Sequence, residues 1–339
     1  MPRYSLLKHA CRHTYFLVGC GSRKRYLIII PHARLHPRDS FDALNPFAPY
    51  TSDMPLPLIL LTLTMAFAFM PARSLLAAPP ETIKFASGDG KTQLTGYLFK
   101  PAGAGPHPGL VMLHGRAGAY SSLKRGTYTA DTLSARHRMW GEFWASRGYM
   151  ALLVDSFGPR GHPQGFPKHS YNDRPGEVSE QFVRPLDAYG ALAYLRQRGD
   201  VTPERIGLQG WSNGGMTLLA AMASDPPGMT NPDAKRGFRA ALAQYPSCRT
   251  QLRQEGYKPY APLLILAASE DDEVSPEVCR QLAEAMRLRG DPVEFVLYEG
   301  AHHSYDDPGK TKQSHGPNRA AMLDTQRRAE AFFQQQLKP

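Results

Sequence analysis

Residues 205–215 read RIGLQGWSNGG, and this stretch decides the fold of the chain. RIGLQ is typical of a short buried strand, and MTLLAA at residues 216–221 is typical of a helix. A serine flanked by glycines joins the two, which is the strand–turn–helix context of a nucleophile elbow. The glycines let the strand and the helix approach closely. We therefore predict that Ser212 is a nucleophile at a helix N-terminus, rather than part of an ordinary glycine-rich turn.

The chain from residue 79 onward alternates β-rich runs with helical stretches. This alternation predicts the α/β class, with a mostly parallel sheet flanked by helices on both faces. Ligands of such sheets bind at the carboxyl ends of the strands, so site residues are expected there. The predicted strands are 82–87, 93–100, 109–113, 151–155, 205–210, 240–245, 263–268 and 293–298, and the predicted helices are 133–147, 178–198, 214–223, 276–289 and 318–337.

A nucleophilic serine requires a base and an acid that orients the base. In α/β-hydrolases the chain order is serine, then acid, then histidine. The strand 263–268 is followed by the acidic run 270–273, in which we favour Asp271 over Asp272 and Glu270. The last strand is followed by His302-His303. One of these two histidines is the expected base, and spacing does not choose between them.

The same geometry predicts an oxyanion hole made of two backbone N–H groups. One belongs to Asn213, directly after the nucleophile, and the other to Arg116, on the loop after the first parallel strand. The side chains of Arg116 and Trp211 are candidates for contact with the substrate. The alternative for each is a side chain on the protein surface.

From about residue 96 to the carboxyl terminus, the chain resembles the dienelactone hydrolase family of the α/β-hydrolase superfamily. The resemblance implies the α/β-hydrolase fold and hydrolysis of an ester or lactone. It rests on LHG at 113–115, DSFGPRG at 155–161, Arg184 with Asp187-Ala188, GWSNGG at 210–215, Asp271 with Val274, and GAHHSY at 300–305.

The resemblance also resolves the open choices at the site. The family's acid precedes a valine or threonine by three residues, which supports Asp271. Its base follows Gly-Ala after one residue, with an aromatic residue two positions later, which selects His303 and Tyr305. An arginine near the strand end helps to hold the substrate carboxylate in this family, which offers Arg160 for that role. The alternative for Arg160 is a salt bridge that anchors its loop.

One departure from the family concerns the nucleophile. The members that give the family its name use cysteine, whereas this chain has Ser212. A cysteine thiolate forms readily near a helix N-terminus, but a serine depends fully on its histidine. The resemblance therefore supports ester hydrolysis without fixing dienelactone as the substrate.

The amino-terminal part of the chain is predicted to direct export. Residues 1–53 are interpreted as a poorly ordered basic extension or a mis-assigned start, and residues 54–78 as a signal peptide. The apolar run 55–70 is shorter than the roughly 20 residues that a membrane span needs, although a buried helix is an alternative. Cleavage is expected after Ala77. Residues 79–339 form the predicted hydrolase domain, which is periplasmic or secreted and has no stable membrane span.

Cysteine content agrees with export. Cys248 and Cys279 form an even pair within the predicted domain and are candidates for a disulfide, with two buried thiols as the alternative.

No metal-ligand spacing is present, so we expect neither a metal nor a cofactor. Half of the formal charge of +10 lies in residues 1–53, and the rest of the charge is dispersed. We therefore expect no nucleic-acid partner.

These observations predict a serine hydrolase that acts on a small-molecule ester or lactone. A prolyl-oligopeptidase-like peptidase shares the fold and triad, but residues 79–339 leave little room for its usual accessory domain. A catalytically silent exported binding protein on the same scaffold is the alternative from another class. The oligomeric state is not predicted.

Overall fold

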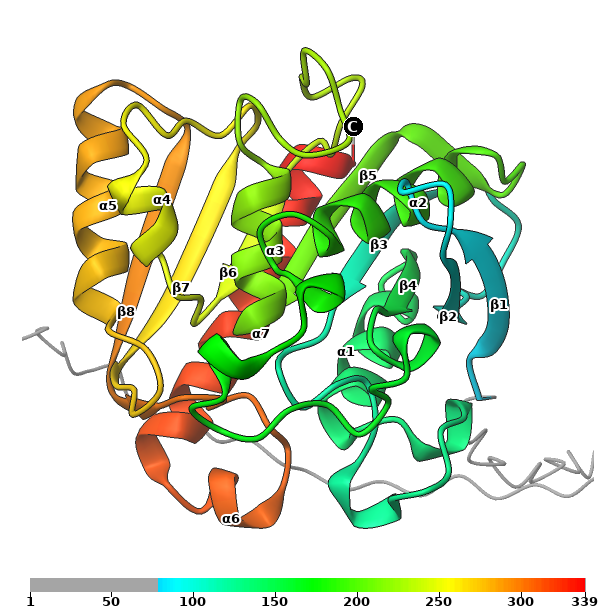
Figure 1. Cartoon of the computed structure of the whole chain (residues 1–339), viewed down its shortest axis with the longest axis horizontal. Coiled ribbons are helices and arrows are strands. Elements are labelled where there is room, and N and C mark those ends of the chain that lie inside the picture. Colours follow the sequence, from blue (N-terminus) through cyan, green and yellow to red (C-terminus); the bar gives the residue numbers. More distant parts are fainter. Residues whose placement is uncertain (1–78, 339) are drawn as a thin grey trace, which may run out of the picture. The chain divides into compact units, whose positions relative to one another are not determined.

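The structure is a computed structural model that describes residues 79–338 (Figure 1). The predicted basic extension at 1–53 and the predicted signal peptide at 54–78 lie outside the described residues. Within residues 79–338, no helix is both long enough and apolar enough to cross a membrane.

One sheet runs through the described residues, with the order β1-β2-β4-β3-β5-β6-β7-β8. β2 pairs antiparallel with β1 and with β4, and all the other pairs are parallel. The mostly parallel sheet expected from the sequence is therefore confirmed. Its strands are β1 (Glu81–Ala86), β2 (Gln93–Phe99), β3 (His107–Leu113), β4 (Met150–Asp155), β5 (Val201–Trp211), β6 (Ala241–Gln244), β7 (Leu263–Glu270) and β8 (Val293–His302).

Helices cover both faces of this sheet. α1 and α7 pack on one face and α2, α3 and α5 on the other, and Figure 1 shows α7, in red, across the sheet from α3. The helices are α1 (Ala135–Ala145), α2 (Arg184–Arg196), α3 (Asn213–Ala221), α4 (Arg249–Arg253), α5 (Pro276–Leu288), α6 (Lys310–Gln313) and α7 (Gly316–Leu337).

One predicted helix boundary was wrong. The helix predicted from residue 178 begins at Arg184, and residues Gly176–Val178 form a separate 3₁₀ turn. Pro185 explains the difference, because proline has no N–H to donate and fits only within the first turn of a helix.

Alternation along the strands divides the core between the two faces. In β3, Leu110 and Met112 point toward α1 and α7, whereas Val111 and Leu113 point toward α2, α3 and α5. All four side chains are fully buried. Because both faces of the sheet are covered, the sequence of β3 is a continuous apolar run. The ends of the strands are then the positions left for polar, reactive side chains.

The turn from β5 into α3 has the tight geometry of a nucleophile elbow. Ser212 has φ 51° and ψ −114°, a strained conformation for a residue with a side chain. A Cβ at Gly210 would lie 2.3 Å from the carbonyl oxygen of Gly214, and one at Gly214 would lie 1.9 Å from that of Leu113. Only glycine fits at these two positions, so the sequence GWSNG is required by the close packing of strand against helix.

A disulfide joins Cys248, at the start of α4, to Cys279 in α5. Of the two interpretations of this cysteine pair, the structure has the bridged one. The bond ties the segment after β6 to the helix after β7.

Candidate active site

Ser212, Asp271 and His303 come together at the carboxyl ends of β5, β7 and β8. The Nε2 atom of His303 lies 3.0 Å from Ser212 Oγ, and its Nδ1 atom lies 2.7 Å from Asp271 Oδ2. A carboxylate can only accept, so Nδ1 carries the proton and the Nε2 lone pair faces the serine. This is the arrangement in which a histidine removes a proton from a serine hydroxyl.

The neighbouring acids and the second histidine have other partners. Asp271 Oδ1 accepts hydrogen bonds from the amides of Glu273 and Val274, both at 2.9 Å, which fixes the carboxylate toward His303. Asp272 pairs with a lysine at the surface. His302 stacks on the ring of His315, with 4.4 Å between their centroids. The structure thus brings together the acid and the base that the family resemblance selects.

Two backbone amides next to Ser212 have the positions expected of an oxyanion hole. Asn213 N–H begins α3, and Arg116 N–H follows Gly115 on the loop after β3. A Cβ at Gly115 would lie 3.5 Å from the Cβ of Ser212, so this loop runs directly beside Ser212. Neither amide donates to another residue in the described part of the chain. Both N–H groups are therefore free to donate a hydrogen bond to a ligand.

The side chain of Arg116 contacts the acidic turn. Its Nε and Nη2 atoms donate to the two oxygens of Glu273 at 2.7 and 2.9 Å, and Nη1 donates to the carbonyl of Phe166 at 3.2 Å. Glu273 Oε2 also lies 3.9 Å from His303 Nε2. Burial opposes ionisation of Glu273, but the hydrogen bonds from Arg116 and the surrounding positive charge outweigh burial and lower its pKa. No pattern in the sequence distinguishes Glu273 within the run of four acids, so its contact with Arg116 was not predicted.

The interpretation of Trp211 as a substrate contact was wrong. Its side chain is fully buried, and its Nε1 atom donates to Asp306 Oδ2 at 2.9 Å. Alternation along β5 explains this placement, because Trp211 points toward the face covered by α1 and α7, where its ring packs against His137 with 5.4 Å between the centroids, and it does not itself line the cavity.

Arg160 also lies away from the cavity that adjoins Ser212. Its two terminal nitrogens donate to both carboxylate oxygens of Asp187 in α2, each at 2.8 Å, and one of them also donates to the carbonyl of Ser156. The structure therefore favours the loop-anchoring salt bridge over contact with a substrate carboxylate.

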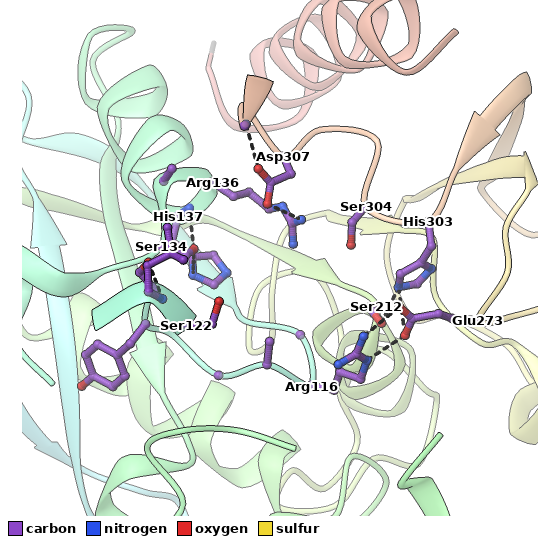
Figure 2. Close-up of a pocket in the computed structure, with 18 residues that line it drawn as sticks. Arg116, Ser122, Ser134, Arg136, His137, Ser212, Glu273, His303, Ser304 and Asp307 are labelled. Atoms are coloured by element: carbon purple, nitrogen blue, oxygen red, sulfur yellow. Dashed lines mark hydrogen bonds and ion pairs between the residues drawn. The ribbon is translucent and has the colours of Figure 1, made fainter. Parts of the chain in front are cut away.

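A cavity of about 350 Å³ opens beside Ser212 and His303 (Figure 2). Its walls come from the loop after β3, the start of α1 and the loops after β7 and β8. Arg136 and His137 of α1 contribute to its lining and were not predicted, because no motif marks them in the helix sequence. Burial lowers the pKa of His137 to about 4, so this side chain is neutral at pH 7.

A buried carboxylate supports the histidine loop from behind. Asp306 is fully buried and forms an ion pair with Arg136. The ring of Tyr245, one of its hydrogen-bond donors, packs edge-on against His303, with 4.8 Å between the ring centroids. Asp306 therefore fixes residues that pack around His303. Its donors are Trp140 Nε1 at 2.8 Å, Trp211 Nε1 at 2.9 Å, Tyr245 Oη at 2.5 Å and Gln244 Nε2 at 3.2 Å.

Comparisons with known proteins place this chain among hydrolases. The profile described as the dienelactone hydrolase family matches residues 94–337. Dipeptidyl aminopeptidase BIII of Pseudoxanthomonas mexicana is 23% identical over 277 residues, which cover 69% of this chain and 37% of that protein. The chain thus spans less than half the length of this curated relative.

Solved structures show the same fold. The apo form of Thermogutta terrifontis esterase 2 has a TM-score of 0.54 and 23% identity, with 78% of this chain and 97% of that chain covered. A second structure of that esterase, phosphorylated by paraoxon, has a TM-score of 0.55 at the same identity and coverage. The fold expected from the sequence, that of the α/β-hydrolases, is confirmed.

Proposed function

This chain belongs to the dienelactone hydrolase family, and we propose that it is a serine hydrolase that cleaves a carboxylic ester or lactone through an acyl-enzyme. The observation that carries the proposal is the continuous path of hydrogen bonds from Asp271 through His303 to Ser212. All three residues follow parallel strands, where ligands of such sheets bind.

The proposed reaction begins with attack of Ser212 Oγ on the ester carbonyl while His303 Nε2 accepts the hydroxyl proton. The carbonyl oxygen becomes an oxyanion and receives hydrogen bonds from the amides of Asn213 and Arg116. His303 then returns its proton to the departing alcohol oxygen. Water attacks the acyl-enzyme and gives its proton to His303, which then passes it to Ser212 Oγ as the acyl–oxygen bond breaks and the acid leaves. Asp271 remains ionised and stabilises the imidazolium that forms twice in each cycle.

Hydrolysis of p-nitrophenyl butyrate by the wild type and by Ser212→Ala tests this function. We expect the substitution to lower kcat by at least about 10³-fold, since the nucleophile is lost. His303→Ala should have a similar effect, with His302→Ala as the matched control that retains activity. Equal rates in the wild type and Ser212→Ala would contradict the proposal and favour a catalytically silent binding protein. Activity lost in His302→Ala and kept in His303→Ala would show that the base is wrongly assigned.

Paraoxon offers a direct label for the nucleophile. Thermogutta terrifontis esterase 2 has been solved in a form phosphorylated by this compound. We expect paraoxon to phosphorylate Ser212 here, because an activated serine hydroxyl attacks phosphorus as it attacks a carbonyl carbon. Peptide mass spectrometry locates the adduct, which should be absent from Ser212→Ala. An adduct on another serine would contradict the assignment of the nucleophile.

Peptide hydrolysis is the second candidate activity, favoured by the likeness to dipeptidyl aminopeptidase BIII. Dipeptidyl p-nitroanilides distinguish it from ester hydrolysis when they are assayed beside p-nitrophenyl butyrate. An esterase should leave the anilides almost unchanged. Faster turnover of an anilide than of the ester would establish the peptidase instead.

We further propose that the protein is exported. The apolar run at 55–70 and the disulfide between Cys248 and Cys279 support this, since disulfides persist in oxidising compartments. Intact-mass measurement of the protein recovered from the periplasm or medium should give a chain that begins at residue 78. A chain that remains inside the cell with residues 54–78 attached would contradict export.

A further inference from the structure

The cavity beside Ser212 extends well beyond the catalytic residues. Figure 2 shows Ser212, Glu273 and His303 at one end and Ser122 and His137 at the other. A cavity of about 350 Å³ holds a small organic group attached to the ester. The chemistry of its walls therefore indicates which part of a substrate it accepts.

Both guanidinium groups in the cavity wall already face carboxylates. Arg116 makes two hydrogen bonds to Glu273. Arg136 lies between two acids of the histidine loop, with Nε 3.2 Å from Asp306 Oδ1 and Nη2 3.4 Å from Asp307 Oδ2. Neither arginine offers an uncompensated positive charge to a ligand.

The charges that line the cavity cancel one another. The carboxylates of Glu273 and Asp307 balance the guanidinium groups of Arg116 and Arg136. His137 adds no charge because it is neutral. Lys124 and Arg125, near the outer loop, are exposed to water and do not line the cavity, so solvent screens them. A carboxylate that entered the cavity would lose its hydration without gaining an uncompensated positive charge.

The arginine that the family resemblance offers for a substrate carboxylate does not alter this balance. Arg160 donates to both oxygens of Asp187 and does not line the cavity. Asp187 therefore neutralises the positive charge of Arg160, which is not available to bind a substrate carboxylate.

Uncharged hydrogen-bonding groups are available instead. Between residues 79 and 338, the hydroxyls of Ser122 and Ser304 have no hydrogen-bond partner, and both residues line the cavity (Figure 2). Hydroxyls donate and accept, so these groups complement hydroxyl or carbonyl oxygens of a ligand.

We propose that this cavity holds an uncharged, hydroxyl-bearing part of the ester, as in a glycerol or sugar ester, and disfavours a part that carries a carboxylate. The proposal rests on the hydrolase function proposed above. It departs from the carboxylate-bearing substrate implied by the family resemblance, because the charges of Arg116, Arg136 and Arg160 are all compensated within this chain.

Matched esters assayed with the purified protein test the proposal on both sides of the ester bond. On the acyl side, p-nitrophenyl butyrate is compared with p-nitrophenyl hemisuccinate, in which a carboxylate replaces the terminal methyl group. On the alcohol side, 2,3-dihydroxypropyl, propyl and 2-carboxyethyl butyrates are compared by titration of the released acid. We expect the dihydroxypropyl ester to be the best alcohol-side substrate and each carboxylate ester to lose about tenfold or more in kcat/KM against its neutral partner.

A charge-removing variant links this preference to the cavity. Asp307 is 41% exposed, so Asp307→Asn removes a cavity carboxylate with little disturbance of the core. We expect it to raise kcat/KM for the hemisuccinate relative to the butyrate about threefold or more at low salt, and less at high salt. The matched control is Glu284→Gln on the exposed side of α5, which removes the same charge outside the cavity and should leave the ratio unchanged.

The outcomes separate this inference from the proposed function. Carboxylate esters hydrolysed as well as their neutral partners would overturn the inference while leaving the hydrolase intact. A ratio unchanged by Asp307→Asn, or changed equally by Glu284→Gln, would also overturn it, because the cavity charges would then not set the preference. Failure to hydrolyse any of the five esters would overturn the proposed function and the inference together.

Discussion

Two arginine–carboxylate pairs in this molecule each form two hydrogen bonds but have different surroundings. Arg160 with Asp187 and Arg116 with Glu273 each join a loop at a strand end to a distant carboxylate through two hydrogen bonds. The side chains of the first pair are 6% and 0% exposed, whereas those of the second are 25% and 15% exposed. Only the second pair lines the cavity beside Ser212.

The difference in burial gives the two ion pairs different roles. The pair of Arg160 and Asp187 attaches the segment after β4 to α2. Because both side chains are buried, leaving one charge without its partner would destabilise the fold. The pair of Arg116 and Glu273 joins the loop after β3, which carries a proposed oxyanion donor, to the turn that carries Asp271, so its loss should affect chemistry more than folding. An arginine at a strand end is therefore assigned to a substrate only after its own carboxylate partner is known.

Breaking the buried pair should have the largest effect. Asp187→Asn leaves the Arg160 guanidinium buried with only part of its partners and should lower the free energy of unfolding by about 3 kcal/mol. Urea unfolding followed by circular dichroism measures this change. Because neither residue lines the cavity, the folded fraction should keep its kcat.

A double substitution sharpens this prediction. Arg160→Met with Asp187→Leu removes both charges and should recover most of the lost stability, since apolar replacements of a buried pair are often neutral. A loss of stability as large as that of Asp187→Asn would show that shape, rather than the unpaired charge, controls this part of the fold.

Breaking the cavity pair should reduce catalysis with little change in folding. Glu273→Gln weakens the hold on Arg116, whose amide is the proposed oxyanion donor, so kcat should fall about tenfold with KM nearly unchanged. The matched control is Asp272→Asn on the same turn, whose carboxylate pairs with Lys168 at the surface. If kcat fell equally in both variants, loss of negative charge on the turn would explain the effect better than loss of the contact.

The smallest expected effect is the pH dependence of that same pair. The pKa of Glu273 is lowered in the folded protein, so its ion pair contributes stability above its ordinary pKa of 4.5 and loses it as the pH falls through the lower folded value. The free energy of unfolding of the wild type should exceed that of Glu273→Gln by less than about 1 kcal/mol at pH 7. Urea unfolding should show that gap closing below pH 4.5. A gap that is constant down to pH 3 would contradict the assignment.

Much of the fold was predictable from the sequence because its signals are local. Every strand of the sheet overlaps a predicted run, and the elbow glycines reveal the tight turn without knowledge of their neighbours. Chain order and family spacing then selected Asp271 and His303, which the structure brings to Ser212. These residues follow strands, and parallel strands end at one edge of the sheet.

The rest of the site depends on contacts between distant segments. Arg160 and Trp211 lie at strand ends, as the prediction required, yet their partners Asp187 and Asp306 lie 27 and 95 residues away along the chain. The partner of Arg116 is 157 residues away, so its role was equally hidden. Periodicity places a side chain on a face of the sheet or a helix, but it does not identify what faces that side chain.

The bridge between Cys248 and Cys279 has a practical consequence for production of the protein. The chain-entropy relation gives such a bond about 3–4 kcal/mol when it closes a loop of 31 residues. The cytosol of a standard expression host keeps thiols reduced, so material made there lacks this contribution. Oxidising hosts or periplasmic secretion should therefore yield a more stable protein. Protein made by an oxidising route and protein made in a reducing cytosol should differ in melting temperature until both are oxidised.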